Sequence, residues 1–314
     1  MSGVELRMDP RTPPMTREAF CRNRPAFSIA LDGYVHGGPW FSREGPHASF
    51  NHHEGVDRLS TRATCAQVLM AIRQGLFDTF REDGLPRALV WADDCDEDVC
   101  TAWFLLHHPH LVTHTINPLL NRLVAMEDAL DSTAGAYPYP ACLPSLGELA
   151  WVFEPYRRAR ASGLVDGRDP AALAGVVEDV AGRIARHIVG GGSQLAPDLR
   201  YRTLHQGQGW RLVEELGAQA RTALFADGVR AFVAARPRPD GRWTYTVGRM
   251  SPFVPFDVPV LLAALDAAEG GEVEHWGGGN TIGGSPRIAG SRLGPEEAAR
   301  IVGDALDRSR GGTP

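Results

Sequence analysis

Two adjacent histidines near the start of the chain are the residues best suited to chemistry. His52 and His53 follow the short apolar segment 48–50, where a strand would end and its loop would reach a ligand. Neighbouring side chains on an extended strand point to opposite sides. One imidazole can therefore face a metal ion while the other faces a carboxylate, a second ion or substrate. Glu54 adds a carboxylate, and a solvated histidine pair in a surface loop is the alternative interpretation.

Acidic residues gather at two later places. Five acids lie within the six residues 93–98, directly after the apolar segment 87–92, and a further group around Asp128 and Asp131 follows an apolar stretch. Clustered carboxylates repel one another unless protons or a cation neutralise them, and a divalent metal ion is the natural compensation. The alternatives are a solvated charge run and an ordinary helix end.

Strands and helices that alternate along the first half of the chain must position these groups. We expect strands over 25–31 and 87–92, with loop 32–38 after the first of them offering Asp32 and His36, while residues 1 to 24 form an irregular lead-in. Helical spacing predicts one helix that the hydroxyls of Ser60 and Thr61 could cap, one over 99–106 and one over 169–188. The first helix has the apolar stripe Val68, Leu69, Ile72 and Leu76, and the second has Val99, Trp103 and Leu106. The stripe of the third helix is Leu173, Val176, Val177, Val180, Ile184 and Ile188.

A second pattern of elements follows the glycines at 190–192. It predicts helices over 207–220, 258–269 and 295–307 and strands over 222–226, 229–235 and 243–248. We therefore predict an α/β protein whose N-terminal domain has a largely parallel sheet with flanking helices and whose smaller C-terminal domain is also α/β. The expected bounds are 1–190, a linker at 191–206, and 207–314. The site is expected in the cleft between the domains, because open α/β sheets bind ligands beyond the carboxyl ends of their strands.

The glycine-rich segment 276–293 is the remaining candidate for ligand binding. It lacks the GK[ST] of a P-loop and the strand-turn-helix setting of a dinucleotide fingerprint. Its glycines still permit close backbone approach, and Arg249, Arg287 or Arg292 could add positive charge for an anion. A glycine-rich turn without a ligand is the alternative.

Composition limits the partners and the compartment. The 314 residues carry a formal net charge of −6 and a pI of about 6.0, which argues against a long nucleic acid and favours a small substrate. The five cysteines are scattered without a CxxC pair, so reduced thiols are expected. The start has no signal-peptide pattern and no apolar run is long enough for a bilayer. A cytoplasmic protein without membrane partners is predicted, and a homodimer is left open.

Together these segments resemble the DHH phosphoesterase superfamily. Residues 50–54 look like its Asp-His-His motif, residues 96–102 like its Asp-x-Asp loop opening a helix, and Asp128 or Asp131 like its last metal aspartate. Residues 277–279, with Ala289-Gly290 ten residues later, look like the glycine-rich substrate-binding segment of its C-terminal domain. The resemblance covers most of the chain in outline and only these short segments closely.

Three departures accompany the resemblance. The leading aspartate of the first motif is Asn51, and Asn280 stands where the glycine-rich motif has histidine. The Asp-x-Asp loop, which normally precedes the Asp-His-His motif, follows it here. These departures imply a divergent member with rearranged motif order.

The resemblance implies a metal-dependent hydrolase of a small phosphorylated, anionic substrate. Carboxylate and imidazole ligands without thiolate suit Mn²⁺ best, with Zn²⁺ or Fe²⁺ as alternatives. The predicted ligands are His52, Asp96, Asp98 and Asp128, with Asp32, His36, Asp94 and Asp131 in reserve. His53 would orient substrate or transfer a proton, and the anionic end would be bound by Gly278, Gly279, Asn280, Arg249 and Arg287. A hydrolase of amides or esters and a binding protein without catalysis are the rival hypotheses.

Overall fold

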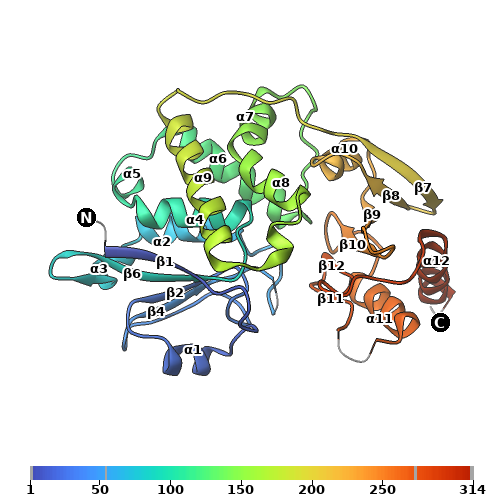
Figure 1. Cartoon of the computed structure of the whole chain (residues 1–314), viewed down its shortest axis with the longest axis horizontal. Helices are drawn as coiled ribbons and strands as arrows, with labels where there is room; N and C mark the ends of the chain where they lie inside the picture. The colour runs from blue at the N-terminus through green and yellow to red at the C-terminus, as the bar shows by residue number, and fades with distance from the viewer. Residues whose placement is uncertain (1–2, 54, 272–273, 312–314) are drawn as a thin grey trace. The chain divides into compact units, whose positions relative to one another are not determined.

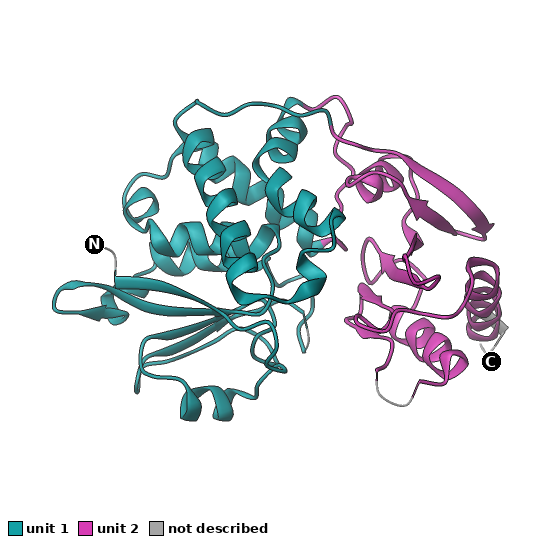
Figure 2. Cartoon of the chain, in the orientation of Figure 1, with its two compact units in different colours: residues 1–132, 144–196 teal, residues 133–143, 197–314 magenta. Residues whose placement is uncertain are grey.

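The computed structural model describes residues 3–53, 55–271 and 274–311, so Glu54 lies outside the described residues. The chain divides into two compact units (Figure 2). The first comprises residues 1–132 and 144–196, and the second comprises 133–143 and 197–314. Both contain a sheet with helices, so the α/β class is confirmed.

The sheet of the first unit brings the ends of four parallel strands to one edge. Its order is β1 (Gly3–Met8), β6 (Leu85–Ala92), β2 (Ser28–Leu31), β4 (His47–Phe50) and β3 (Trp40–Ser42), with β5 (Arg81–Glu82) paired to β6. The β1–β6, β6–β2 and β2–β4 pairs are parallel, whereas β3 and β5 pair antiparallel. Because parallel strands end at the same edge, the loops that begin at Asp32, Asn51 and Asp93 are neighbours.

Helices cover the two faces of this sheet unequally (Figure 1). Helix α1 (Arg17–Asn23) lies on one face, where Phe20 packs edge-on against Tyr34, Trp40 and His47. Helices α2 (Thr64–Arg73) and α4 (Glu97–His107) lie on the opposite face and pack on each other. The other helices are α3 (Leu76–Thr79), α5 (His110–Thr113), α6 (Pro118–Ser132), α7 (Pro144–Val152), α8 (Glu154–Ala161), the short 3₁₀ helix η1 (Val165–Gly167) and α9 (Pro170–Ile188). The predicted apolar stripe of α9 is buried, as its period of 3.6 required.

The second unit has a six-stranded sheet of its own. Its order is β11 (Gly277–Gly278), β12 (Ile282–Gly284), β10 (Trp243–Arg249), β9 (Ala231–Pro237), β8 (Trp210–Glu215) and β7 (Tyr201–Gly207). Only the β8–β9 pair is parallel among these described strands, and α10 (Ala220–Ala226) provides its crossover. Helices α11 (Val258–Glu269) and α12 (Pro295–Gly311) pack on each other, and apolar residues of both join those of the sheet in one core.

Four local predictions were wrong. The lead-in contains β1 and α1, because Val4, Leu6 and Met8 alternate and the strand finds a parallel partner in β6. Residues 207–220 form a strand hairpin rather than a helix, since Gly209, at φ 83°, turns β7 back into β8. The apolar run 222–226 is helical, because a short buried run fits either structure by period alone. Leu76 opens α3 rather than extending α2, after Gly75 adopts φ 96°.

Candidate metal centre

A buried cluster of one imidazole and three carboxylates lies at the carboxyl edge of the first sheet. Nε2 of His52 is 2.6 Å from Oδ2 of Asp131, 3.3 Å from Oδ1 of Asp32 and 3.5 Å from Oδ2 of Asp98. Two sets of potential ligand atoms each fall within 4.8 Å of one another: Asp32, His52 and His53, and His52, Asp98 and Asp131. The side chain of His52 is fully buried. The structure thus brings together residues that are up to about 100 positions apart in sequence.

Asn51 holds the loop that presents the histidines. Its Nδ2 donates to the carbonyls of Val35 and Gly37, and its Oδ1 accepts from the backbone N–H of His53. All the hydrogen-bonding groups of this buried amide are therefore directed at the backbone. At the position that resembles the family's leading aspartate, this chain has a residue that organises the loop.

Asp98 connects the cluster to the start of α2. Its two carboxylate oxygens accept from the backbone N–H groups of Thr64, at 2.7 Å, and Cys65, at 2.6 Å. These donors are free because Ala63, at the N-cap of α2, has no side chain that can accept from them. A carboxylate from α4 therefore caps α2, which fixes the orientation of Asp98 beside His52.

Asp32 is held from two sides. Its Oδ1 accepts from Oγ1 of Thr64 at 3.0 Å and lies 2.9 Å from Nε2 of His53. The residue has a left-handed backbone at φ 51°, which is uncommon outside glycine and turns the chain sharply at the end of β2. This turn directs the carboxylate back over the sheet edge toward the histidines.

Electrostatic effects within the cluster oppose one another. Burial alone would lower the pKa of His52, but the Asp131 and Asp32 carboxylates outweigh it and raise that pKa well above its usual value. Burial raises the pKa of Asp98 to about 7, with Asp131 and Asp32 adding repulsion. Neighbouring histidines overcome burial at Asp32 and at Asp131, where they hold the carboxyl pKa below its ordinary value. The cluster has more buried negative charge than its single buried imidazole can neutralise.

Several predicted ligands fall outside both ligand sets among the described residues. Asp96 is the N-cap of α4, where Oδ1 accepts from the N–H of Val99 at 2.9 Å. Asp128 accepts from the N–H of Ala63 and from Arg62, while Oδ1 of Asp94 accepts from the N–H of Cys95. The side chain of His36 is exposed. Of the eight predicted ligands, the sets contain His52, Asp32, Asp98 and Asp131.

We predict that Asp96 acts mainly as a helix cap. Asp96→Asn keeps an acceptor for Val99 and should leave bound Mn²⁺ and stability nearly unchanged. Asp96→Ala removes the cap and should lower the free energy of unfolding by about 1 kcal/mol. Denaturant unfolding and elemental analysis of both variants would check this. Loss of Mn²⁺ from Asp96→Asn would show instead that this carboxylate is a ligand.

The predicted anion-binding residues lie in the second unit. Gly278, at φ 153°, is packed so tightly that a Cβ would come within 2.3 Å of Gly283 Cα. The Gly279 N–H donates to the Ile282 carbonyl, closing the β11–β12 hairpin. These glycines therefore have a packing role in the hairpin. The side chain of Arg287, which follows the hairpin in the sequence, is exposed.

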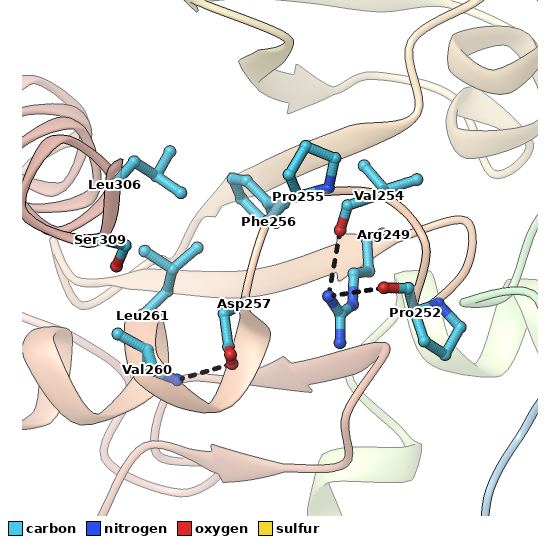
Figure 3. A pocket seen from close by; sticks show the side chains of 10 residues that line it. All are labelled: Arg249, Pro252, Val254, Pro255, Phe256, Asp257, Val260, Leu261, Leu306 and Ser309. Atoms are coloured by element: carbon cyan, nitrogen blue, oxygen red, sulfur yellow. Dashed lines mark hydrogen bonds between the residues drawn. The ribbon is translucent and has the colours of Figure 1, made fainter. Parts of the chain in front are cut away.

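Arg249 is the most constrained cation of that unit's predicted binding residues. Its guanidinium donates to the carbonyls of Asn280, Pro252 and Val254, and no described carboxylate forms an ion pair with it (Figure 3). Burial lowers its pKa. It lines a pocket of about 250 Å³ together with Phe256, Asp257 and residues of α11 and α12. Figure 3 shows the guanidinium beside the loop that contains Pro252 and Val254.

Two residues of the centre had no functional signal in the sequence. Thr64, whose hydroxyl donates to Asp32, lies within a predicted helix, and Arg58 lies within a predicted loop. In the structure Arg58 is buried and has three partners beside the histidines. Residue type and spacing do not identify such partners, because their contacts join segments that the fold alone brings together.

Comparison of the chain with protein-family models, curated proteins and solved structures found no match. None of the helices in the described part of the chain is both long and apolar enough to cross a membrane.

Proposed function

We propose that this protein is a metal-dependent hydrolase of small phosphorylated compounds. The observation that carries the proposal is the contact of His52 Nε2 with three carboxylates, at 2.6 Å from Asp131, 3.3 Å from Asp32 and 3.5 Å from Asp98. One imidazole nitrogen has at most one proton to share among three carboxylates, and clustered carboxylates repel one another. A divalent cation in place of that proton would be within reach of all these ligand atoms.

The donor set fits a divalent ion. Ligand atoms of His52, Asp98 and Asp131 all lie within 4.8 Å of one another, which suits metal–ligand distances of roughly 2.0 to 2.2 Å after small adjustments. Oxygen and imidazole nitrogen without thiolate favour Mn²⁺, with Zn²⁺ or Fe²⁺ as alternatives. The positive charge would also offset repulsion between the buried carboxylates. Asp32 is the nearest further ligand.

When bound, such an ion lowers the pKa of a coordinated water and stabilises charge on the group under attack. The chain's own residues would do the rest. The two backbone donors on Asp98 and the Thr64 hydroxyl on Asp32 hold the carboxylates in place, as outer partners of metal sites do. His53, whose side chain is 38% exposed, is the residue of the centre placed to contact a substrate.

In this proposal the chain is a divergent relative of the DHH phosphoesterases. The residues that would bind the anionic end of the substrate are Arg249, Arg287, Asn280, Gly278 and Gly279. Support comes from the largely buried Arg249 guanidinium, which forms no ion pair with a described carboxylate and lines a pocket of about 250 Å³. A positive charge in a pocket is the local feature that an anionic ligand needs in a chain of net charge −6.

The test is a substrate panel on Mn²⁺-loaded protein. It would contain pyrophosphate, a p-nitrophenyl phosphomonoester, a bis(p-nitrophenyl) phosphodiester and p-nitrophenyl esters and anilides. We expect turnover of one or more phosphate compounds, lost in Asp131→Asn and retained in Asp128→Asn, three residues away on the same helix. Turnover of only an ester or an anilide would show that the substrate is a non-phosphate compound. Metal binding with no turnover would contradict the hydrolase assignment.

A further inference from the structure

Arg58 is a buried cation beside the metal centre that forms no ion pair with a described carboxylate. It is 5% exposed. Nε donates to the carbonyl of His52 at 3.0 Å, and Nη1 donates to the carbonyl of Asp131 at 3.1 Å. Nη2 lies 3.3 Å from Nδ1 of His53. The Arg58 side chain thus contacts the backbone of two proposed ligand residues, His52 and Asp131. It also contacts the ring of His53, which lies between those ligands and solvent.

The contact with His53 fixes which ring nitrogen has the proton. A guanidinium has only N–H donors and stays charged in proteins, so Nδ1 of His53 must be the acceptor. In the neutral ring the proton is then on Nε2, which lies 2.9 Å from Oδ1 of Asp32. Nδ1 of His53 therefore accepts from a donor, the Arg58 guanidinium, and Nε2–H donates to an acceptor, the Asp32 carboxylate.

Packing restricts the ring as well. The ring centroids of His52 and His53 are 4.8 Å apart. Gly33, at φ 92°, lies against the other part of the ring, where a Cβ would be 3.4 Å from Cδ2 of His53. The ring is thus held between a glycine, its neighbouring imidazole and the guanidinium, although 38% of the side chain remains exposed.

We infer that Arg58 is a positioning residue that locks His53 as the Nε2–H tautomer directed at Asp32. In this state the nitrogen that faces the cluster can donate a hydrogen bond or a proton but has no lone pair for a metal ion. His53 is therefore excluded from the ligand set, which leaves His52, Asp98, Asp131 and Asp32. The consequence of this positioning for catalysis rests on the proposed function. The assignment of the His53 tautomer does not depend on that function.

The tautomer can be measured in metal-free protein. In ¹⁵N-histidine-labelled, chelator-treated protein, two-bond ¹H–¹⁵N correlation spectra should show an unprotonated Nδ1 and a protonated Nε2 for His53, assigned with His53→Asn. In Arg58→Met, which keeps the length of the side chain but not its donors, the ring should exchange between both tautomers. Arg62→Met is the matched control, because Arg62 is an exposed arginine of the same loop whose side chain contacts Asp128. It should leave the His53 signals unchanged.

Two results would overturn the inference. One is a protonated Nδ1 on His53 in the wild-type protein, which is informative even if Arg58→Met does not fold. The other is an unchanged single tautomer in folded Arg58→Met.

Kinetics provide the second readout. On a phosphate substrate, Arg58→Met should lower kcat about 10- to 100-fold with KM changed less than about 2-fold, and Arg58→Lys should recover part of the loss. A fall in stability with kcat unchanged would reduce Arg58 to a structural role. If the tautomer result holds and no phosphate compound turns over, the hydrolase assignment fails while the positioning of His53 stands.

Discussion

His52→Ala is expected to abolish stoichiometric Mn²⁺ binding and to lower turnover at least about 100-fold. His52 is the one residue common to both potential ligand sets, and its Nε2 lies within 3.5 Å of all three carboxylates. The small alanine side chain leaves the buried carboxylates of Asp32 and Asp98 and the partly exposed one of Asp131 without the imidazole that lies between them. Elemental analysis of purified protein after Mn²⁺ addition and buffer exchange measures the metal, and initial rates measure turnover.

His36→Ala is the matched control for this experiment. The sequence suggested that His36 is also a ligand, but its exposed side chain is absent from both sets among the described residues. It should keep wild-type metal content. If His52→Ala retains its metal, the centre has been assigned to the wrong residues. Loss of metal from both variants would extend the site to the loop that follows β2.

The second large effect is a dependence of metal binding and stability on pH. In the metal-free protein, burial and then Asp131 and Asp32 raise the pKa of Asp98 to about 7, from an ordinary value of 3.8. Between these values the folded chain binds more protons than the unfolded chain, so the free energy of unfolding falls as pH rises from about 4 to 7. The slope is about 1.4 kcal/mol per pH unit at most for one proton.

The other groups of the centre act at the limits of this range. The raised pKa of His52 gives stability that is fully present below about 6.5 and is lost as pH rises through its folded value. The lowered pKa values of Asp32 and Asp131 give stability that is lost as pH falls through their folded values, below about 4. From pH 5 to 6.5, Asp98 is therefore the one of these four residues that determines whether the free energy of unfolding rises or falls with pH.

Mn²⁺ must displace a proton from Asp98 and another from His52, whose pKa is also raised, so its apparent Kd should rise about ten- to a hundredfold per pH unit below 7. Titration calorimetry at pH 5.5, 6.0, 6.5 and 7.5 measures this dependence. Thermal unfolding over the same range should show Tm falling with pH for chelator-treated protein, with stabilisation by Mn²⁺ growing as pH rises.

Asp98→Asn cannot titrate, so it should reduce the pH dependence of the metal-free Tm, and the part that remains comes from Asp96 and Glu127, whose pKa values burial and neighbouring carboxylates also raise. Its baseline will be lower, because an amide places a donor against the N–H of Thr64 or Cys65. The slope rather than the baseline is the readout. A Kd for Mn²⁺ that is constant between pH 5.5 and 7.5 would contradict a protonated ligand in the metal-free centre.

The sequence alone determined the fold class and four residues of the cluster. Strand 87–92 and helix 169–188 followed from apolar runs and a period of 3.6, and β6 and α9 have nearly those bounds. The pairing of histidines with carboxylates after apolar strands also predicted a cluster at a sheet edge, because parallel strands end together. These inferences depend only on local pattern and on a general property of parallel sheets.

Tertiary structure decided which carboxylates meet the imidazole. Asp96 and Asp98 are two residues apart, yet Asp96 caps its own helix while Asp98 caps α2 and faces His52. Asp131 rather than Asp128 reaches His52, because the rotation of α6 about its axis is set by packing on neighbouring helices. Local spacing does not specify that rotation.

Tertiary structure also decided where the hairpin of the second unit forms and which residues contact the ligands of the metal centre. Residues 207–220 became a hairpin because β8 pairs with β9, more than fifteen residues later, and that pairing outweighs helical propensity. Arg58 was one charged loop residue among many in the sequence. It acquired its role only when β4 and α6 placed two carbonyls and one imidazole nitrogen around its guanidinium, since contacts between distant segments leave no period or motif in the chain.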